Sequence, residues 1–163
     1  FAWAGGQALA RYILDHPESV AGKTVLDFGA GSGLGAIAAA MAGAAHVIAA
    51  EIDAFGRTAI ALNARANDVT VEIAGADLVG HIDPGWQVVI AGDVCYEEPM
   101  AGRVVAWLRS LAARALVLIG DPQRTYFPTE GLEFVARYTV ETTIEIEDSD
   151  LRNAAVWRML PRA

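Results

Sequence analysis

Three glycines and a carboxylate have the spacing of a nucleotide-type binding site. The run VLDFGAGSG at residues 25–33 carries Gly29, Gly31 and Gly33, which let a ligand approach the backbone closely. A helix that starts after such a turn offers unpaired N–H groups to a polar ligand. Glu51 stands 20 residues after Gly31, at the end of the next apolar run, where its carboxylate can accept hydrogen bonds from both hydroxyls of a ribose. We therefore predict a nucleotide-type ligand at this turn.

The glycine spacing alone does not distinguish a dinucleotide from S-adenosylmethionine, because Gly31, Gly33 and Ala36 also fit the NAD fingerprint. The carboxylate of Asp27, directly before the turn, would repel a pyrophosphate but suits a ligand with an ammonium and a sulfonium. Asp77 follows a third apolar run, where a carboxylate can accept a hydrogen bond from the amino group of adenine. These two residues favour S-adenosylmethionine as the cofactor, with S-adenosylhomocysteine as its product.

Each of these carboxylates also has a purely structural interpretation. Asp27 can accept hydrogen bonds from the N–H groups of the turn itself, and Asp77 can cap the N-terminus of a helix. Asp53 is a second candidate for the ribose ligand, but its position is more typical of the N-cap of the following helix. We therefore keep Glu51 as the predicted ribose ligand.

Such a site needs strands whose carboxyl ends meet at one edge of a parallel sheet. Apolar runs alternate with amphipathic stretches, which is typical of a Rossmann-like α/β fold with helices on both faces. We predict strands at 24–28, 46–51, 70–74, 87–91 and 115–120, and helices at 5–15, 33–42, 54–66 and 99–113. The last two strands, 134–143 and 154–160, are predicted as an antiparallel pair joined by an acidic loop at 145–150. We expect one domain over residues 1–163.

Composition narrows the choice of partner. The chain has a net charge of −8 and Lys23 as its one lysine, so it lacks the clustered cations that bind nucleic acid. No apolar run approaches the ~20 residues of a membrane span. We expect neither nucleic acid nor membrane as a partner, no metal site, and a monomer. The single cysteine, Cys95, excludes an internal disulfide and fits a reducing compartment, the bacterial cytoplasm. The chain opens at Phe1 without a methionine, so we expect a further N-terminal segment.

Three segments resemble the class I, seven-strand methyltransferases. They are FAWAGGQALARY at 1–12, GDVCYE at 92–97 and LIGDPQR at 118–124. Within that class the chain is similar to the electron transfer flavoprotein β-subunit lysine methyltransferases and their bacterial relatives, often labelled nicotinamide N-methyltransferase-like. The resemblance implies the strand order 3-2-1-4-5-7-6, with strand seven antiparallel. It also implies cofactor contacts from Trp3, Gly5, Gln7, Asp27, Gly29, Gly31, Glu51, Asp77 and Asp93.

The resemblance further implies that residues 93–97 face the methyl acceptor. Base-modifying enzymes of the class carry Asn/Asp-Pro-Pro-aromatic at this place, whereas this chain has Asp93-Val94-Cys95-Tyr96. The difference favours a protein lysine as the acceptor, and the β-subunit of electron transfer flavoprotein as the protein substrate. A small-molecule N-methyltransferase and a non-catalytic cofactor-binding module stay as alternatives.

A lysine must lose its proton before it accepts a methyl group, which costs roughly 4.6 kcal/mol at pH 7 for a pKa of ~10.4. We expect Asp93 or Glu97 to hold the incoming ammonium and pass its proton to water, and Tyr96 to line the transfer path with an aromatic wall. These three are the predicted catalytic residues. Their structural alternatives are a strand-end turn for Asp93, core packing for Tyr96 and a first-turn helix charge for Glu97. Cys95 is expected to be buried apolar filler.

Overall fold

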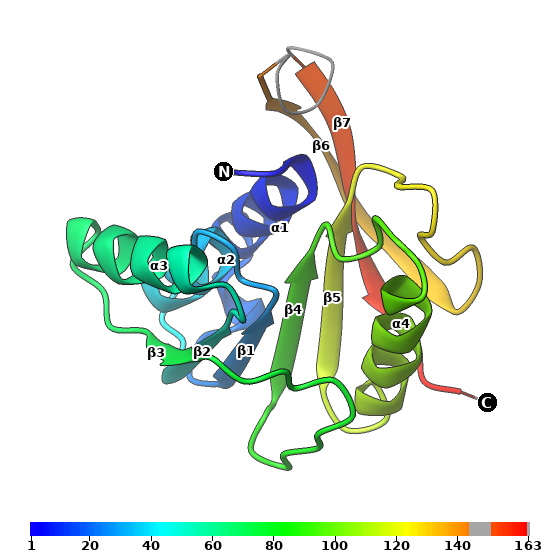
Figure 1. The fold of residues 1–163 in the computed structure, drawn as a ribbon, viewed down its shortest axis with the longest axis horizontal. Helices are drawn as coiled ribbons and strands as arrows, with labels where there is room; N and C mark the ends of the chain where they lie inside the picture. Colours follow the sequence, from blue (N-terminus) through cyan, green and yellow to red (C-terminus); the bar gives the residue numbers. More distant parts are fainter. Residues whose placement is uncertain (144–150, 163) are drawn as a thin grey trace.

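Helices and strands alternate from α1 to β3, and α4 separates β4 from the last three strands (Figure 1). The computed structural model describes residues 1–143 and 151–162, so the predicted acidic loop at 145–150 lies outside the described residues. The helices are α1 (Ala4–Asp15), α2 (Leu34–Met41), α3 (Ala54–Ala66) and α4 (Met100–Leu111), with a short 3-10 helix η1 (Pro17–Ser19). The strands are β1 (Thr24–Phe28), β2 (His46–Ala50), β3 (Glu72–Ala74), β4 (Val88–Gly92), β5 (Leu116–Asp121), β6 (Leu132–Glu141) and β7 (Leu151–Met159). None of the described helices is long and apolar enough to cross a bilayer.

Among the described residues, the strands form one sheet in the order β3-β2-β1-β4-β5-β7-β6. Strands β1 to β5 pair in parallel, whereas β7 is antiparallel to both β5 and β6. The predicted fold class, strand order and antiparallel strand are therefore confirmed. The order of the parallel strands reverses between β1 and β4. In open α/β sheets, ligands bind outside the carboxyl ends of the strands at such a reversal.

Successive residues of the central strands pack on opposite faces of the sheet. On β1, Val25 belongs to the core shared with α1 and α2, whereas Leu26 belongs to the core shared with α4. The same alternation separates Val88 from Val89 on β4. Because helices cover both faces, these strands appear in the sequence as continuous apolar runs. The predicted arrangement of helices on both faces is confirmed.

Element boundaries differ from the predicted ones by up to three residues, while β1 and α3 match. Helix α2 begins at Leu34 because Gly33 has a φ of +87°, which is outside the α-helical region. Strand β7 starts at Leu151, three residues before the predicted start, because its pairing with β6 extends to Glu141. Strand β3 is short and lies at the edge of the sheet, with β2 as its neighbour.

Helix α1 approaches the carboxyl end of β5 so closely that no side chain fits between them. A Cβ atom on Gly5 would overlap the carbonyl oxygen of Gly120, and a Cβ atom on Gly120 would overlap the carbonyl oxygen of Gly5. A Cβ atom on Gly92, at the end of β4, would likewise clash with the backbone of Gly6. This contact places the first turn of α1 beside the ends of β4 and β5.

Candidate functional site

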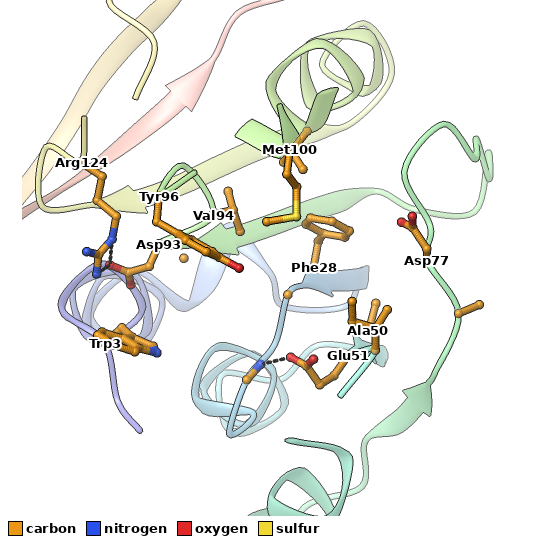
Figure 2. Close-up of a pocket in the computed structure, with 16 residues that line it drawn as sticks. Trp3, Phe28, Ala50, Glu51, Asp77, Asp93, Val94, Tyr96, Met100 and Arg124 are labelled. Carbon is orange, nitrogen blue, oxygen red and sulfur yellow. Dashed lines mark hydrogen bonds and ion pairs between the residues drawn. The ribbon is translucent and has the colours of Figure 1, made fainter. Parts of the chain in front are cut away.

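A cavity of about 580 Å³ opens at the carboxyl ends of β1, β2 and β4 (Figure 2). Its volume lies within the roughly 300–1,000 Å³ of small-molecule and cofactor sites. A smaller hollow of about 40 Å³ adjoins it and reaches Asp27. The large cavity is lined by Trp3, Phe28, Gly29, Gly31, Ala50, Glu51, Ile52, Ala76, Asp77, Gly92, Asp93, Val94, Tyr96, Met100, Val104 and Arg124.

The turn after β1 holds the carboxylate of Glu51 at the cavity wall. Gly29 and Gly31 have φ values of +65° and +56°, which glycine adopts without a steric penalty. The backbone N–H of Gly31 donates to Oε2 of Glu51 at 2.8 Å, and the backbone N–H of Asp53 donates to Oε1 at 2.9 Å. Each oxygen keeps a lone pair for a ligand. This geometry suits two ribose hydroxyls, the ligand groups predicted for Glu51.

Asp53 behaves as its position in the sequence suggests. It is the N-cap of α3, and its Oδ2 accepts a hydrogen bond of 2.8 Å from the backbone N–H of Gly56. This bond satisfies one of the unpaired donors in the first turn of the helix. Asp53 is not among the residues that line either cavity, so the preference for Glu51 as the ribose-facing carboxylate agrees with the geometry.

Asp27 is a buried carboxylate beneath the glycine turn, and it is 4% exposed. Its Oδ2 accepts a hydrogen bond of 2.7 Å from the backbone N–H of Ala36, in the first turn of α2. Burial raises the pKa of Asp27 to about 7, and the charge of Glu51 adds to the effect while the Ala36 bond opposes it. The structural interpretation of Asp27 is therefore correct in part: the carboxylate accepts a backbone hydrogen bond, but the donor lies in α2 and not in the turn. A cationic ligand group in the smaller hollow would favour the ionised carboxylate.

Asp77 lies on the far side of the large cavity from Asp93 (Figure 2). Its side chain is exposed, and its Oδ1 accepts a hydrogen bond of 3.0 Å from the backbone N–H of Val79. Residues 77–78 have no regular structure and residues 79–80 lie in a turn, so no helix begins here and the N-cap alternative is wrong. The carboxylate lines the cavity at the place where an adenine amino group is predicted.

Asp93 marks the opposite end of the cavity. The residue has a φ of +58°, a left-handed conformation at the end of β4, and its own backbone N–H donates to the carbonyl of Gly120. Its Oδ2 accepts a hydrogen bond of 2.8 Å from the backbone N–H of Gly6 in α1. Burial raises the pKa of Asp93, although the nearby Arg124 and the Gly6 bond act against the rise.

Arg124 completes this end of the cavity. Its Nη2 and Nε donate to Oδ1 of Asp93 at 2.8 and 3.1 Å. Its guanidinium lies 5.4 Å from the centre of the Trp3 ring, within the range of a cation–π contact. The three side chains gather at one side of the cavity, with Tyr96 next to them (Figure 2).

Three other residues of the predicted acceptor segment, Tyr96, Glu97 and Cys95, lie in different surroundings. Tyr96 lines the cavity and is 56% exposed, so the core-packing alternative is wrong. Glu97 is exposed and does not line the cavity; its backbone carbonyl accepts from Ala101 at the start of α4. The predicted role of Glu97 as ammonium anchor therefore finds no support in its position. Cys95 is fully buried, and burial raises the pKa of its thiol to about 12, as expected for an apolar filler.

Two residues expected at the cofactor lie outside the cavity lining. Gln7 donates from Nε2 to the carbonyls of Ala2 and Glu141, at 2.7 and 2.8 Å. It thereby ties the segment before α1 to the end of β6. Gly5 makes the close backbone contact with Gly120 described above. In this structure both residues position α1, and the cofactor contacts that the resemblance implies for them stay predictions.

The apolar wall of the cavity was missed. Phe28 ends β1, Ile52 follows Glu51, and Met100 and Val104 lie one turn apart on α4. Their sequence signal is position: apolar residues at the carboxyl ends of parallel strands, and an i, i+4 pair on the helix that follows β4. Within the described residues, no group of three or more His, Cys, Asp or Glu side chains has the arrangement of a metal site.

Relatives of this chain are methyltransferases. The family model for ribosomal protein L11 methyltransferase (PrmA) matches residues 8–92. The electron transfer flavoprotein beta subunit lysine methyltransferase of Homo sapiens is 37% identical over 166 residues, covering 98% of this chain and 63% of the human protein. The protein of the same name from Xenopus laevis is 36% identical, over 98% of this chain and 68% of the relative. The chain thus spans about two thirds of the length of these relatives.

Solved structures share the fold at lower identity. Magnesium protoporphyrin IX methyltransferase from Synechocystis PCC 6803, with bound S-adenosylmethionine, has a TM-score of 0.67 and 19% identity. The match covers 94% of this chain and 79% of that one, and at this identity it shows the fold alone. The sheet order, the cavity at the strand reversal and the similarity to the two lysine methyltransferases agree. The chain belongs to the class I S-adenosylmethionine-dependent methyltransferases and, within them, to the family of the electron transfer flavoprotein β-subunit lysine methyltransferases.

Proposed function

We propose that this chain transfers a methyl group from S-adenosylmethionine to a lysine side chain of a protein, and that its substrate is the β-subunit of electron transfer flavoprotein. The observation that carries the proposal is the two-ended cavity. Glu51, fixed by Gly31, faces one part of it, while Tyr96 and Trp3 form an aromatic rim at the other. Family membership supports both the methyl donor and the class of acceptor.

The residues present fit the methyl donor. Asp77, Glu51 and Asp27 lie in succession around the cavity and the adjoining hollow, where adenine, ribose and ammonium groups would need an acceptor. Phe28 and Met100 add apolar surface to the cavity wall. When bound, the donor carries its methyl group on a positively charged sulfur, and the acceptor nitrogen forms the new C–N bond as the C–S bond breaks, with the electron pair left on sulfur.

The acceptor end suits a long side chain that enters from outside. Trp3 is 41% exposed and Tyr96 is 56% exposed, so both aromatic faces border solvent and the cavity at once. Aromatic faces attract a cation such as an ammonium or sulfonium. The net charge of −8 also favours a basic patch on the partner protein, because opposite charges steer two proteins together.

Methyl transfer to the proposed substrate tests this function directly. The chain is incubated with methyl-labelled S-adenosylmethionine and purified β-subunit, and the label is mapped by mass spectrometry. We expect label on lysine, and its loss when S-adenosylhomocysteine is added in excess. A β-subunit with the labelled lysines changed to arginine is the matched control.

Two other outcomes would redirect the proposal. Label on another protein of a whole-cell extract, with none on the β-subunit, would retain the reaction and reject the substrate. Binding of S-adenosylhomocysteine by calorimetry without label on any protein would reject protein methylation. Label on nicotinamide or a related small amine would then favour a small-molecule acceptor.

A further inference from the structure

The acceptor end of the cavity contains a carboxylate whose two oxygens are both engaged. Oδ2 of Asp93 accepts from the backbone of Gly6, and Oδ1 accepts two hydrogen bonds from the guanidinium of Arg124. The side chain of Asp93 is 6% exposed and that of Arg124 is 17% exposed. Trp3 covers the guanidinium on one side. The two charges are therefore fixed against each other at the cavity wall.

This arrangement bears on the protonation state of a lysine acceptor. A carboxylate within about 4–6 Å of an ammonium favours the charged form, by about 1–3 pKa units, and so opposes the loss of the proton. An unpaired Asp93 would hold the acceptor in the form that cannot attack. A guanidinium bound to the same carboxylate cancels most of that effect, because the acceptor then meets a pair with no net charge.

We propose, on the basis of the function proposed above, that Arg124 offsets the charge of Asp93 at the acceptor end of the cavity and thereby allows the acceptor lysine to release its proton to water before methyl transfer. Arg124 is thus a positioning residue that acts through Asp93. The neutral amine supplies its lone pair to the methyl carbon, and the product leaves as a methylammonium.

Other ionisable groups lie near the pair, and their charges enter the balance. From β5, Asp121 accepts at Oδ1 a hydrogen bond of 2.7 Å from the backbone N–H of Arg124, and burial raises the pKa of Asp121 to about 6. Tyr96 lines the same end of the cavity, and the preceding residue, Cys95, is fully buried, which raises the pKa of its thiol to about 12. The charge of Glu98 also raises the pKa of the Cys95 thiol, by less than burial and the charge of Asp121 do. Helix α1 contributes the backbone N–H of Gly6.

The pH profile of a single turnover separates this role from simple structural support. Rates are measured with donor and β-subunit both saturating, so that the acid limb reports deprotonation in the bound complex. For Arg124→Met we expect the acid limb to move up by about one pH unit, because Asp93 then holds the ammonium. For Asp93→Asn we expect it to move down, since Arg124 then acts alone. Arg124→Lys, which keeps the charge, and the double variant Arg124→Met/Asp93→Asn should keep the limb near that of the wild type.

Opposite shifts in the two single variants are the decisive result, because lost packing lowers a rate equally at every pH. Calorimetry with S-adenosylhomocysteine shows whether each variant retains a folded donor site. A drop for Arg124→Met that is the same at all pH values would overturn the proposal. If Arg124→Met fails to bind S-adenosylhomocysteine, the test rests on Asp93→Asn alone. An acid limb of Asp93→Asn that stays in place or moves up then overturns the proposal. Failure of the proposed function is a separate result, since the wild-type chain then labels no lysine.

Discussion

The carboxylate of Glu51 and the backbone N–H of Gly31 are joined by a hydrogen bond of 2.8 Å, which ties the end of β2 to the turn after β1. The bond orients a carboxylate that lines the cavity. In Glu51→Gln, an amide NH₂ must face either the N–H of Gly31 or that of Asp53, so one acceptor is lost and the side chain turns.

We expect Glu51→Gln to weaken S-adenosylhomocysteine binding by about tenfold, because a hydrogen bond to a charged group contributes about 1.5–3 kcal/mol and part of it is retained by the amide. Calorimetry measures the affinity. Glu72→Gln, the same change at an exposed residue of β3 that pairs with His46, is the matched control and should bind as the wild type does. Equal affinity in both variants would remove Glu51 from the cofactor site.

The raised pKa of Asp27 predicts how the stability of the fold depends on pH. Burial raises its pKa from 3.8 to about 7, so between these values the unfolded chain releases a proton that the folded chain retains. The contribution of Asp27 to stability is therefore full at low pH and is lost as pH rises from about 4 to about 7. Asn at this position does not titrate and can still accept from Ala36. We expect the Tm of Asp27→Asn minus that of the wild type to increase over this window, by several degrees at pH 8.

Ligand binding gives the same carboxylate an independent test. An ammonium of S-adenosylhomocysteine bound at the predicted place would stabilise an ionised Asp27, so we expect the affinity of the wild type to rise between pH 5 and pH 8. The affinity of Asp27→Asn should be weaker and nearly flat over that range. In the stability measurement, a Tm difference between Asp27→Asn and the wild type that stays constant from pH 4 to pH 8 would contradict the first prediction. It would mean that Asp27 titrates alike in the folded and unfolded chains.

The elements that carry the predicted donor side of the site could be predicted because their signals are local. β1 and α3 begin and end where the apolar pattern and the cap Asp53 indicate, and the glycine turn lies between them. Glu51 follows β2 directly, so its place at the carboxyl edge of the sheet is determined once the strand is recognised. Parallel strands bring their carboxyl ends together, which makes the chain order of these motifs sufficient.

The acceptor side depends on contacts between distant parts of the chain. Asp93 meets Gly6 across 87 positions and Arg124 across 31, and no periodicity identifies such partners. From the sequence a carboxylate at this strand end is interpreted as an ammonium anchor, and no local signal indicates the guanidinium that binds it in the structure. Gln7 was placed at the cofactor by resemblance alone, whereas its amide bonds to two backbone carbonyls away from the cavity.

A variant of Gln7 tests whether this residue contacts the cofactor, as the resemblance implies. In Gln7→Ala the two hydrogen bonds to Ala2 and Glu141 are lost, and both lie at the surface. We expect the Tm to fall by about 2–5 °C, from about 1 kcal/mol of lost hydrogen bonding. Affinity for S-adenosylhomocysteine should stay within about twofold of the wild type in calorimetry. A tenfold loss of affinity without a change in Tm would restore Gln7 to the cofactor site.

The close contact of α1 with β5 predicts opposite effects on stability for alanine at two nearby glycines, Gly120 and Gly6. In Gly120→Ala the new methyl group would overlap the backbone of Gly5, and overpacking of this kind costs about 1–3 kcal/mol. A Cβ atom on Gly6 has 3.9 Å to its nearest neighbour, an oxygen of Asp93, and alanine is the better helix former by about 0.5–1 kcal/mol. We expect the Tm to fall by about 3–10 °C for Gly120→Ala and to rise by about 2 °C for Gly6→Ala.

Gly120→Ala also shows how far the contact between α1 and β5 supports the acceptor end of the cavity. Gly120 accepts through its carbonyl from the backbone N–H of Asp93, so a displaced α1 also disturbs the carboxylate and, with it, Arg124. Methyl transfer by Gly120→Ala should therefore fall more steeply than its affinity for S-adenosylhomocysteine, whose predicted contacts at Glu51 and Asp77 lie elsewhere. Equal losses of rate and affinity, measured well below the Tm of the variant, would show that the contact supports the whole cavity and not the acceptor end in particular.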